Sequence, residues 1–210
     1  MKTLKVHVEF FEEMLALQPG DPNIYTNFIA SKAPDAESRE EEIAAIGAYE
    51  YEDKKMSVFP RDDKGKAFLY DYHWKGFFKD VCGALRYADG YKSEKMAAYK
   101  KRIDGLVFVS PRKIPLILPK RGFIGCCQRP LRTSSPKGEF QSLKSSESVP
   151  EGTTQDFEIL ILKDSLLPLV IEWLDYGKLR GTGEWRNSGK GRFYFTAVDC
   201  DGEVYGNMPE

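Results

Sequence analysis

Cysteine and histidine are scarce in this 210-residue chain, and none of them has the spacing of a metal site. Structural zinc sites use paired ligands a few residues apart. The sequence also lacks an apolar run near the ~18 residues that a membrane helix needs. Its first residues alternate and then turn acidic, unlike a signal peptide. We therefore predict a cytoplasmic protein with no metal, no cofactor and no membrane partner. The residues concerned are Cys82, Cys126, Cys127, Cys200, His7 and His73.

Charge is distributed unevenly along the chain, although the net charge is only −1. Residues 1–63 carry −7, residues 64–144 carry +12 and residues 145–210 carry −6. A concentrated positive segment is a candidate contact surface for polyphosphate. Folding can also scatter such a block over several faces, so charge alone leaves an ordinary solvated surface open.

Hydrophobic periodicity predicts strands at both ends of the chain. Residues 3–10 and 192–198 alternate apolar and polar side chains, as half-buried strands do. Residues 105–109 and 156–162 are shorter apolar stretches typical of further strands.

Helices are expected between these strands. From His73 to Arg86 apolar residues recur every three or four positions, which predicts a helix with Trp74 in the core. Further helices are expected over residues 92–102 and from Ser165 to a stop at Gly177. The order predicts an α+β fold, a ferredoxin-like, RRM-type sheet with helices on one face and a long basic insertion.

Two segments interrupt this pattern. Residues 18–55 begin as a loop and continue as an acidic helix, which Asp35 can cap. Residues 120–152 are rich in serine, glycine and proline and are basic as far as Lys144, which is typical of a long arm. We predict a single domain over residues 1–210 that carries both insertions.

The most specific motif is GTGEWRNSGKG at residues 181–191. Two Gly-x-Gly pairs flank a basic residue, and glycine allows close approach of another backbone. Exposed N–H groups with neighbouring cations can cradle a phosphate. The motif is neither a P-loop nor a dinucleotide fingerprint, and a mobile turn is the alternative interpretation. Its candidate contacts are Gly181, Gly183, Trp185, Arg186, Gly189, Lys190, Gly191 and Arg192, with Trp185 as a base-stacking residue.

The glycine spacing, after a helix near the C-terminus, is similar to the glycine-rich loop of the RAMP superfamily of CRISPR RNA-binding proteins. In DYHWKGFFKDVCGALR, Lys75 and Gly76 near the start of a helix and Arg86 at its end resemble the family's Lys-Gly segment. SVPEGTTQDFEILIL resembles the family's second half. One departure is that the family's serine-rich approach is replaced by Tyr70, Asp71, Tyr72, His73 and Trp74.

The resemblance implies a fold that binds guide RNA, with a basic thumb that presses on the strand. The arm at residues 120–152 lies where such a thumb would be. The contacts that this implies in the arm are Arg121, Arg129, Arg132, Lys137 and Lys144. On the first helix they are Lys75, Gly76 and Arg86, to which Lys79 is added because it shares a face with Lys75.

Three functions stay open at this point. The first is a non-catalytic subunit that binds RNA or another single strand and assembles with itself or with CRISPR-complex subunits. The second is a metal-independent endoribonuclease in which His73 is the acid or base and Lys75 and Lys79 stabilise charge. Against this, a lone histidine at a helix start is more often a cap or a surface residue. The third is a phage-encoded mimic that binds protein through its acidic flanks.

Overall fold

The computed structural model describes residues 1–20, 56–135 and 138–209. The acidic helix expected within residues 18–55 and Lys137 of the arm fall outside these ranges, apart from residues 18–20. Among the described residues, no helix is long and apolar enough to cross a membrane.

A five-stranded antiparallel sheet forms the base of the molecule. Its order is β12 (Val204–Gly206), β11 (Phe193–Asp199), β1 (Lys2–Phe10), β10 (Thr153–Ile161) and β6 (Val107–Ser110). In β1 every second side chain is buried, because a strand points successive side chains to opposite faces. The mixture of this sheet with helices confirms the predicted α+β class.

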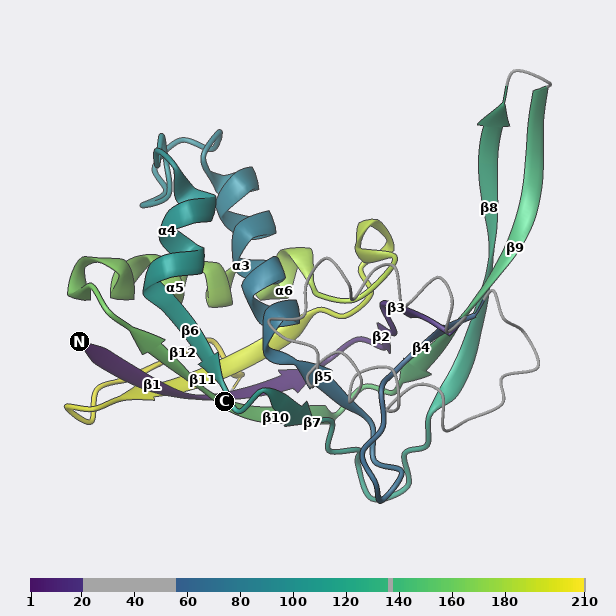
Figure 1. The fold of residues 1–210 in the computed structure, drawn as a ribbon, viewed down its shortest axis with the longest axis horizontal. Helices are drawn as coiled ribbons and strands as arrows, with labels where there is room; N and C mark the ends of the chain where they lie inside the picture. Colours follow the sequence, from purple (N-terminus) through teal and green to yellow (C-terminus); the bar gives the residue numbers. More distant parts are fainter. Residues whose placement is uncertain (21–55, 136–137, 210) are drawn as a thin grey trace, which may run out of the picture.

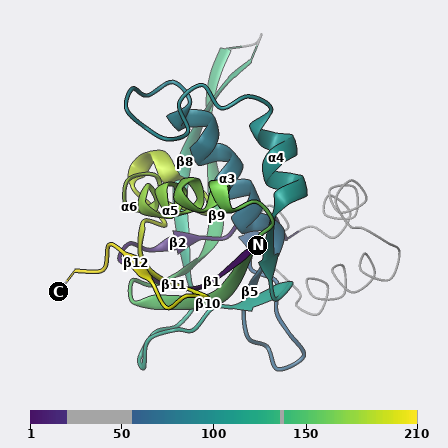
Figure 2. The same cartoon turned by 90° about the vertical axis from the view of Figure 1, so that its left-hand side faces the viewer.

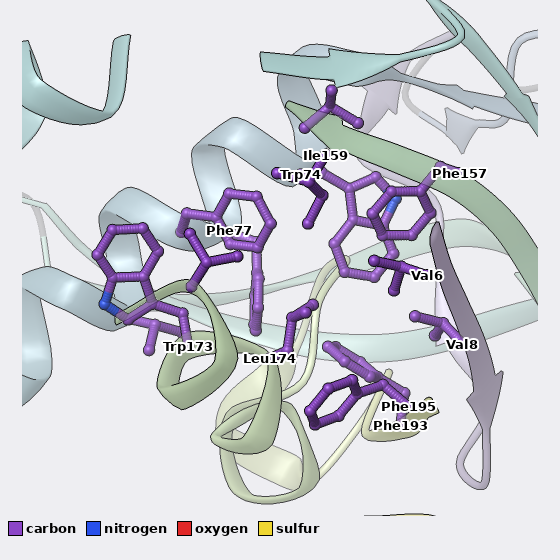
Figure 3. Packing of buried hydrophobic residues seen from close by; sticks show 14 of the residues in the cluster. Val6, Val8, Trp74, Phe77, Phe157, Ile159, Trp173, Leu174, Phe193 and Phe195 are labelled. Carbon is purple, nitrogen blue, oxygen red and sulfur yellow. The ribbon is translucent and has the colours of Figure 1, made fainter. Parts of the chain in front are cut away.

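The helices lie on one face of the sheet (Figures 1 and 2). They are α3 (Asp71–Leu85), α4 (Tyr99–Leu106), α5 (Leu167–Asp175) and the single turn α6 (Gly177–Arg180), with short 3-10 turns η1 (Asp164–Leu166) and η2 (Arg186–Ser188). Figure 3 shows the core between the helices and the sheet, where Trp74 of α3 packs on Phe157 of β10 with ring centroids 4.6 Å apart. Trp74 is 1% exposed, as predicted, and Trp173 of α5 is 0% exposed.

One predicted helix start is wrong. The helix expected at residue 92 begins only at Tyr99, because Lys95 and Ala98 have left-handed backbones (φ 56° and 49°), which a right-handed helix does not contain. The stop expected at Gly177 agrees with the end of α5 at Asp175, although Gly177 then begins the single turn α6. The ring of Phe193 packs directly on its Cα, where any Cβ would overlap that ring.

A long β-hairpin leaves the main body (Figure 1). Strands β8 (Gly125–Ser135) and β9 (Gly138–Val149) pair antiparallel along their whole length. At its base the hairpin joins β2 (Met14–Leu15), β4 (Ser57–Val58) and β3 (Gln18–Pro19) in a second sheet. Strands β5 (Phe68–Tyr70) and β7 (Lys113–Pro115) form a small third sheet. The base of the hairpin therefore lies beside β2, and Leu15 of β2 contacts Gly183 of the glycine motif.

Candidate nucleic-acid interface

A groove of about 470 Å³ lies between α3 and the glycine loop, which we define as residues 181–191. Three segments line it: the β2–β3 segment, the first turns of α3 and the loop itself. A Cβ added at Gly76 would meet no described atom within 4 Å, so the helix leaves this part of the groove open. The lining residues are Leu17, Gln18, Tyr72, His73, Gly76, Phe77, Asp80, Thr182, Gly183 and Arg186.

The loop glycines serve the protein's own main chain. A Cβ on Gly191 would overlap the carbonyl oxygen of Thr182, and the Thr182 N–H donates to the Gly191 carbonyl at 2.9 Å. Gly181 lies against Lys190 and Gly191 in the same way, and a Cβ on Gly183 would come within 2.6 Å of the Leu15 carbonyl oxygen. At these three glycines, the space beside the backbone that was expected to take a ligand is therefore occupied by the protein itself.

The remaining glycine, Gly189, ends the 3-10 turn η2 with a left-handed backbone (φ 81°). Its carbonyl accepts a hydrogen bond from Arg192 Nε at 3.0 Å. The segment from Trp185 to Lys190 is the part of the loop that faces outward. This outward segment, and not the buried glycines, is what a ligand can reach.

Asp80 of α3 holds the arginine at the centre of the loop. Its Oδ2 accepts from Arg186 Nη1 at 2.7 Å and from Arg180 Nε at 2.9 Å. Both arginine side chains are about one-third exposed. Two guanidinium groups therefore share one carboxylate at the mouth of the groove, and Arg180 Nη1 also donates to Asn187 Oδ1 at 3.1 Å.

The two cations at the end of the loop are also paired. Lys190 Nζ lies 2.8 Å from Glu13 Oε2, and Arg192 Nη2 lies 2.8 Å from Glu12 Oε1. Both carboxylates come from the turn after β1. These pairs join the loop to the edge of the hairpin sheet, because β2 follows that turn directly.

Glu184 connects the loop to the base of the hairpin. Its carboxylate lies 2.7 Å from Arg129 Nη2 and 2.7 Å from Lys144 Nζ. It also accepts hydrogen bonds from the hydroxyl groups of Ser57 and Ser146, at 2.9 Å and 3.1 Å. The Glu184 side chain is 13% exposed and that of Arg129 is 8% exposed. A mostly buried carboxylate with four donors therefore fixes the hairpin against the loop.

Trp185 is the exposed aromatic residue of the loop. Its backbone is left-handed (φ 56°), which is unusual for a large side chain and turns the indole outward. The guanidinium carbon of Arg129 lies 5.2 Å from the ring centroid. The two residues place an aromatic face next to a cation, an arrangement on which bases stack.

The other cations predicted on α3 lie away from the groove. Lys79 Nζ pairs with Asp104 Oδ1 at 2.5 Å, and Lys75 Nζ donates to the Asp104 carbonyl at 3.3 Å. Both residues therefore face α4. Arg86 stacks on Tyr99 at 5.1 Å, about 15 Å along the helix from Gly76 at 1.5 Å per residue. Of the predicted Lys-Gly segment, only Gly76 reaches the groove.

The arm residues divide into three groups. Arg129 and Lys144 face the loop through Glu184. Arg121 lies in the turn before β8 and lines a separate, smaller hollow with Glu13 and Ser148. Arg132 lies in the distal half of β8, opposite Gln141 in the register of the two strands.

His73 and Asp71 have local roles at the start of α3. The backbone N–H of Tyr70 donates to His73 Nδ1 at 3.2 Å, so this nitrogen is occupied as an acceptor and is not available as a base. Asp71 lies 3.4 Å from Arg112. Burial raises the pKa of Asp71 above its ordinary value, and Arg112 works against that rise. No cluster in the described ranges groups three or more metal-ligating side chains.

A larger cavity of about 690 Å³ lies on the sheet face opposite the helices. Its charged lining is Lys5, His7, Asp156 and Glu158, and His7 Nδ1 lies 2.7 Å from Asp156 Oδ1. Two carboxylates outnumber one lysine, so a phosphate would be repelled there. The smaller groove beside the arginine-bearing loop is the better candidate for an anionic strand.

The carboxylates of the site were not predictable as such from the sequence. Asp80, Glu12, Glu13 and Glu184 pair with cations around the loop, and Arg180 joins them just before it. The only signal was Glu184, which lies inside the glycine motif itself. The six cations and four carboxylates in these pairs leave a local excess of positive charge.

Acid should weaken the Glu13–Lys190 pair. Partial burial raises the pKa of Glu13, but hydrogen bonds from Lys190 and Ser148 outweigh it, so the pKa lies below 4.5. The stabilisation is therefore present above that ordinary pKa and is lost as the pH falls through the lowered one. We expect the midpoint of thermal unfolding to fall less steeply below about pH 5 in Lys190→Gln than in the unmodified protein. Equal slopes would contradict this coupling.

No protein-family model matches the sequence. No curated protein matches it either. Among solved structures, a chain of the Type III-B Cmr-beta complex bound to cognate target RNA is similar over 98% of this chain, at 12% identity and a TM-score of 0.54. This chain covers 60% of that chain, less than two thirds of its length. A chain of a Type IV-B CRISPR complex is similar at 12% identity and a TM-score of 0.44, over 99% of this chain and 94% of that one.

Proposed function

We propose that this protein binds single-stranded RNA, without cleaving it, in the groove between α3 and the glycine loop. The observation that carries the proposal is the group of cations around one exposed aromatic residue: Arg180 and Arg186 at the groove mouth and Arg129 under Trp185. Cations that follow the backbone and an aromatic residue that takes a base are the usual elements of single-strand binding.

The fold supports the same proposal. The order β11-β1-β10-β6, with α3 and α5 as the connecting helices, corresponds to the 4-1-3-2 order of a ferredoxin-like sheet. We take residues 1–210 as one such domain, with insertions at 18–55 and 120–152. The Cmr-beta structure that shares this fold was solved with target RNA bound, which favours RNA over DNA as the ligand. By that analogy, assembly with CRISPR-complex subunits is part of the proposal.

The internal carboxylates limit the affinity. A phosphate that binds Arg186 competes with Asp80 for the same guanidinium, so part of the gain is offset by the pair that it replaces. Because Asp80 also holds Arg180, its charge remains compensated when Arg186 turns to the strand. Binding should therefore be moderate and strongly dependent on salt.

The salt dependence can be tested at Arg186. We expect the logarithm of the affinity for a 12-nucleotide RNA to fall linearly with the logarithm of salt concentration, and Arg186→Gln to reduce that slope by about 0.7, the value for one phosphate contact on a single strand. Fluorescence anisotropy at several salt concentrations measures both slopes. Lys95→Gln is the matched control, because Lys95 is a cation 86% exposed on a distant loop.

The alternatives give different results in the same assay. If Arg186→Gln and Lys95→Gln behave alike, the loop is not the binding site. Shortening of the RNA during incubation, lost in His73→Ala, would support the endoribonuclease instead. Absence of any RNA binding, with binding to a protein of a CRISPR complex, would support the mimic.

A further inference from the structure

Gln18 is a buried polar residue at the floor of the groove. It lies in β3, is 1% exposed and belongs to the groove lining. Its Nε2 donates to the hydroxyl of Tyr72 at 3.0 Å. This hydrogen bond fixes the amide plane and directs the carbonyl oxygen, Oε1, elsewhere.

Gln18 Oε1 is buried and has no hydrogen-bond partner in the part of the chain that the structure describes. Buried polar atoms in proteins are nearly always paired, because an unpaired one loses its hydration without compensation. Gln18 belongs to the groove lining, so a donor that enters the groove can pair with Oε1 once a small turn of the amide uncovers this atom.

Flat rings stand beside this acceptor. The ring of Tyr72 lies 4.6 Å from the imidazole of His73 and 5.3 Å from the ring of Tyr70, to which it is inclined by only 14°. Tyr72 and His73 both line the groove, so a planar group that enters it meets aromatic side chains. The volume of about 470 Å³ is sufficient for one nucleotide unit, and Gly76 leaves the wall beside it free of a side chain.

We propose that this groove takes one nucleobase of the bound strand, and that Gln18 Oε1 selects bases that carry an exocyclic amino group. The ligand class rests on the proposed RNA-binding function. Arg186 at the groove mouth holds the adjoining phosphate, while the base enters beside Tyr72 and donates its amino hydrogen to Gln18 Oε1.

Cytosine and uracil provide the sharpest comparison. They have the same size and shape, but cytosine presents an amino donor at C4 where uracil presents a carbonyl acceptor. A carbonyl placed against Oε1 would bring two acceptors together and leave both unpaired. We expect a cytosine 12-mer to bind about fivefold more tightly than a uracil 12-mer, the effect of one neutral hydrogen bond.

The test uses Gln18→Met, which keeps the side-chain length and removes both polar atoms. We expect the cytosine-to-uracil ratio to fall to about one, with the salt slope unchanged. The thermal midpoint should change little, because the lost hydrogen bond from Nε2 to Tyr72 is offset by removal of the unpaired buried acceptor. Gln128→Met is the matched control, because Gln128 is an exposed amide on β8 that does not line the groove. It should keep the full preference.

A second arm uses the mononucleotides CMP and UMP, whose binding is followed by chemical-shift changes in the full-length protein. If strands bind but show no cytosine preference, or prefer uracil, the base-selection proposal is wrong while RNA binding stands. If no strand binds, RNA binding is wrong, and selection of CMP over UMP that depends on Gln18 would still support the base site. Equal or absent response to CMP and UMP in that case overturns both.

Discussion

Replacing Glu184 with glutamine should lower the free energy of unfolding by about 3 kcal/mol, because it leaves two cations facing a neutral amide in a largely buried place. Arg129 is the more costly of the two. Its Nε and Nη1 are buried and have no hydrogen-bond partner in the described ranges, so its charge depends on Glu184 and on the ring of Trp185. Urea unfolding measures the loss.

The change should also loosen the base of the hairpin. We expect faster hydrogen exchange at residues 144–148 of β9, where Lys144 and Ser146 both bind Glu184. Glu94→Gln is the control, since the Glu94 carboxylate contacts the exposed Lys95 and the backbone N–H of Gly90, which an amide oxygen can still bind, so its replacement should alter stability little. Equal stability of Glu184→Gln and the unmodified protein would show that the four-donor carboxylate does not hold the hairpin to the loop.

Replacing Gly191 with alanine should be at least as damaging, with an expected loss of ~3 kcal/mol or more. Two causes combine there. The backbone is left-handed (φ 69°), and the new Cβ would overlap the carbonyl oxygen of Thr182, which cannot move without breaking the contact between the two ends of the loop. Thermal and urea unfolding measure the effect.

Gly202→Ala separates these two causes. Gly202 has a similar backbone (φ 84°), but a Cβ there would meet no described atom within 4 Å. Its replacement should cost only the conformational term, about 1 kcal/mol. If the two alanine variants lost equal stability, the close approach of Thr182 to Gly191 would have no energetic importance.

Local patterns predicted the elements that local physics decides. The alternation over residues 3–10 gave β1, because side chains two apart share a face of a strand. The apolar repeat from residue 73 gave α3 to within two residues, and its largest side chain, Trp74, is in the core. The helix expected over 92–102 begins only at Tyr99, because Lys95 and Ala98 have left-handed backbones that interrupt it. The Glu172 carboxylate, which binds the N–H of Lys92 from 80 residues away, contacts the same turn and is invisible to a local pattern.

The candidate site was predicted only in part, for a physical reason. The glycine loop and Gly76 were found because their sequence pattern is local, and the groove does bring them together. The pairs that fix the loop were not found, since Asp80 and Arg186 are 106 residues apart and Glu13 and Lys190 are 177 apart. Lys75 was assigned to the site by the family resemblance and Lys79 by its spacing from Lys75, and the helix turns both to Asp104 instead.

The glycine motif shows the same limit. Close approach of a backbone was the right physical expectation for Gly181, Gly183 and Gly191, but the backbone that approaches is the protein's own. Sequence spacing reports that a side chain is excluded at these positions. It does not report whether a ligand or another part of the chain occupies the space.

The central claim is that a single strand lies in the groove between α3 and the glycine loop and not on the opposite sheet face. Ultraviolet cross-linking of a bound RNA that contains both cytosine and uracil, followed by mass spectrometry of the peptides, tests it directly. We expect cross-links within residues 72–80 and 183–190, with Trp185 and Tyr72 as the main sites. Cross-links confined to β1, β6 and β10 around His7 and Asp156 would contradict the account.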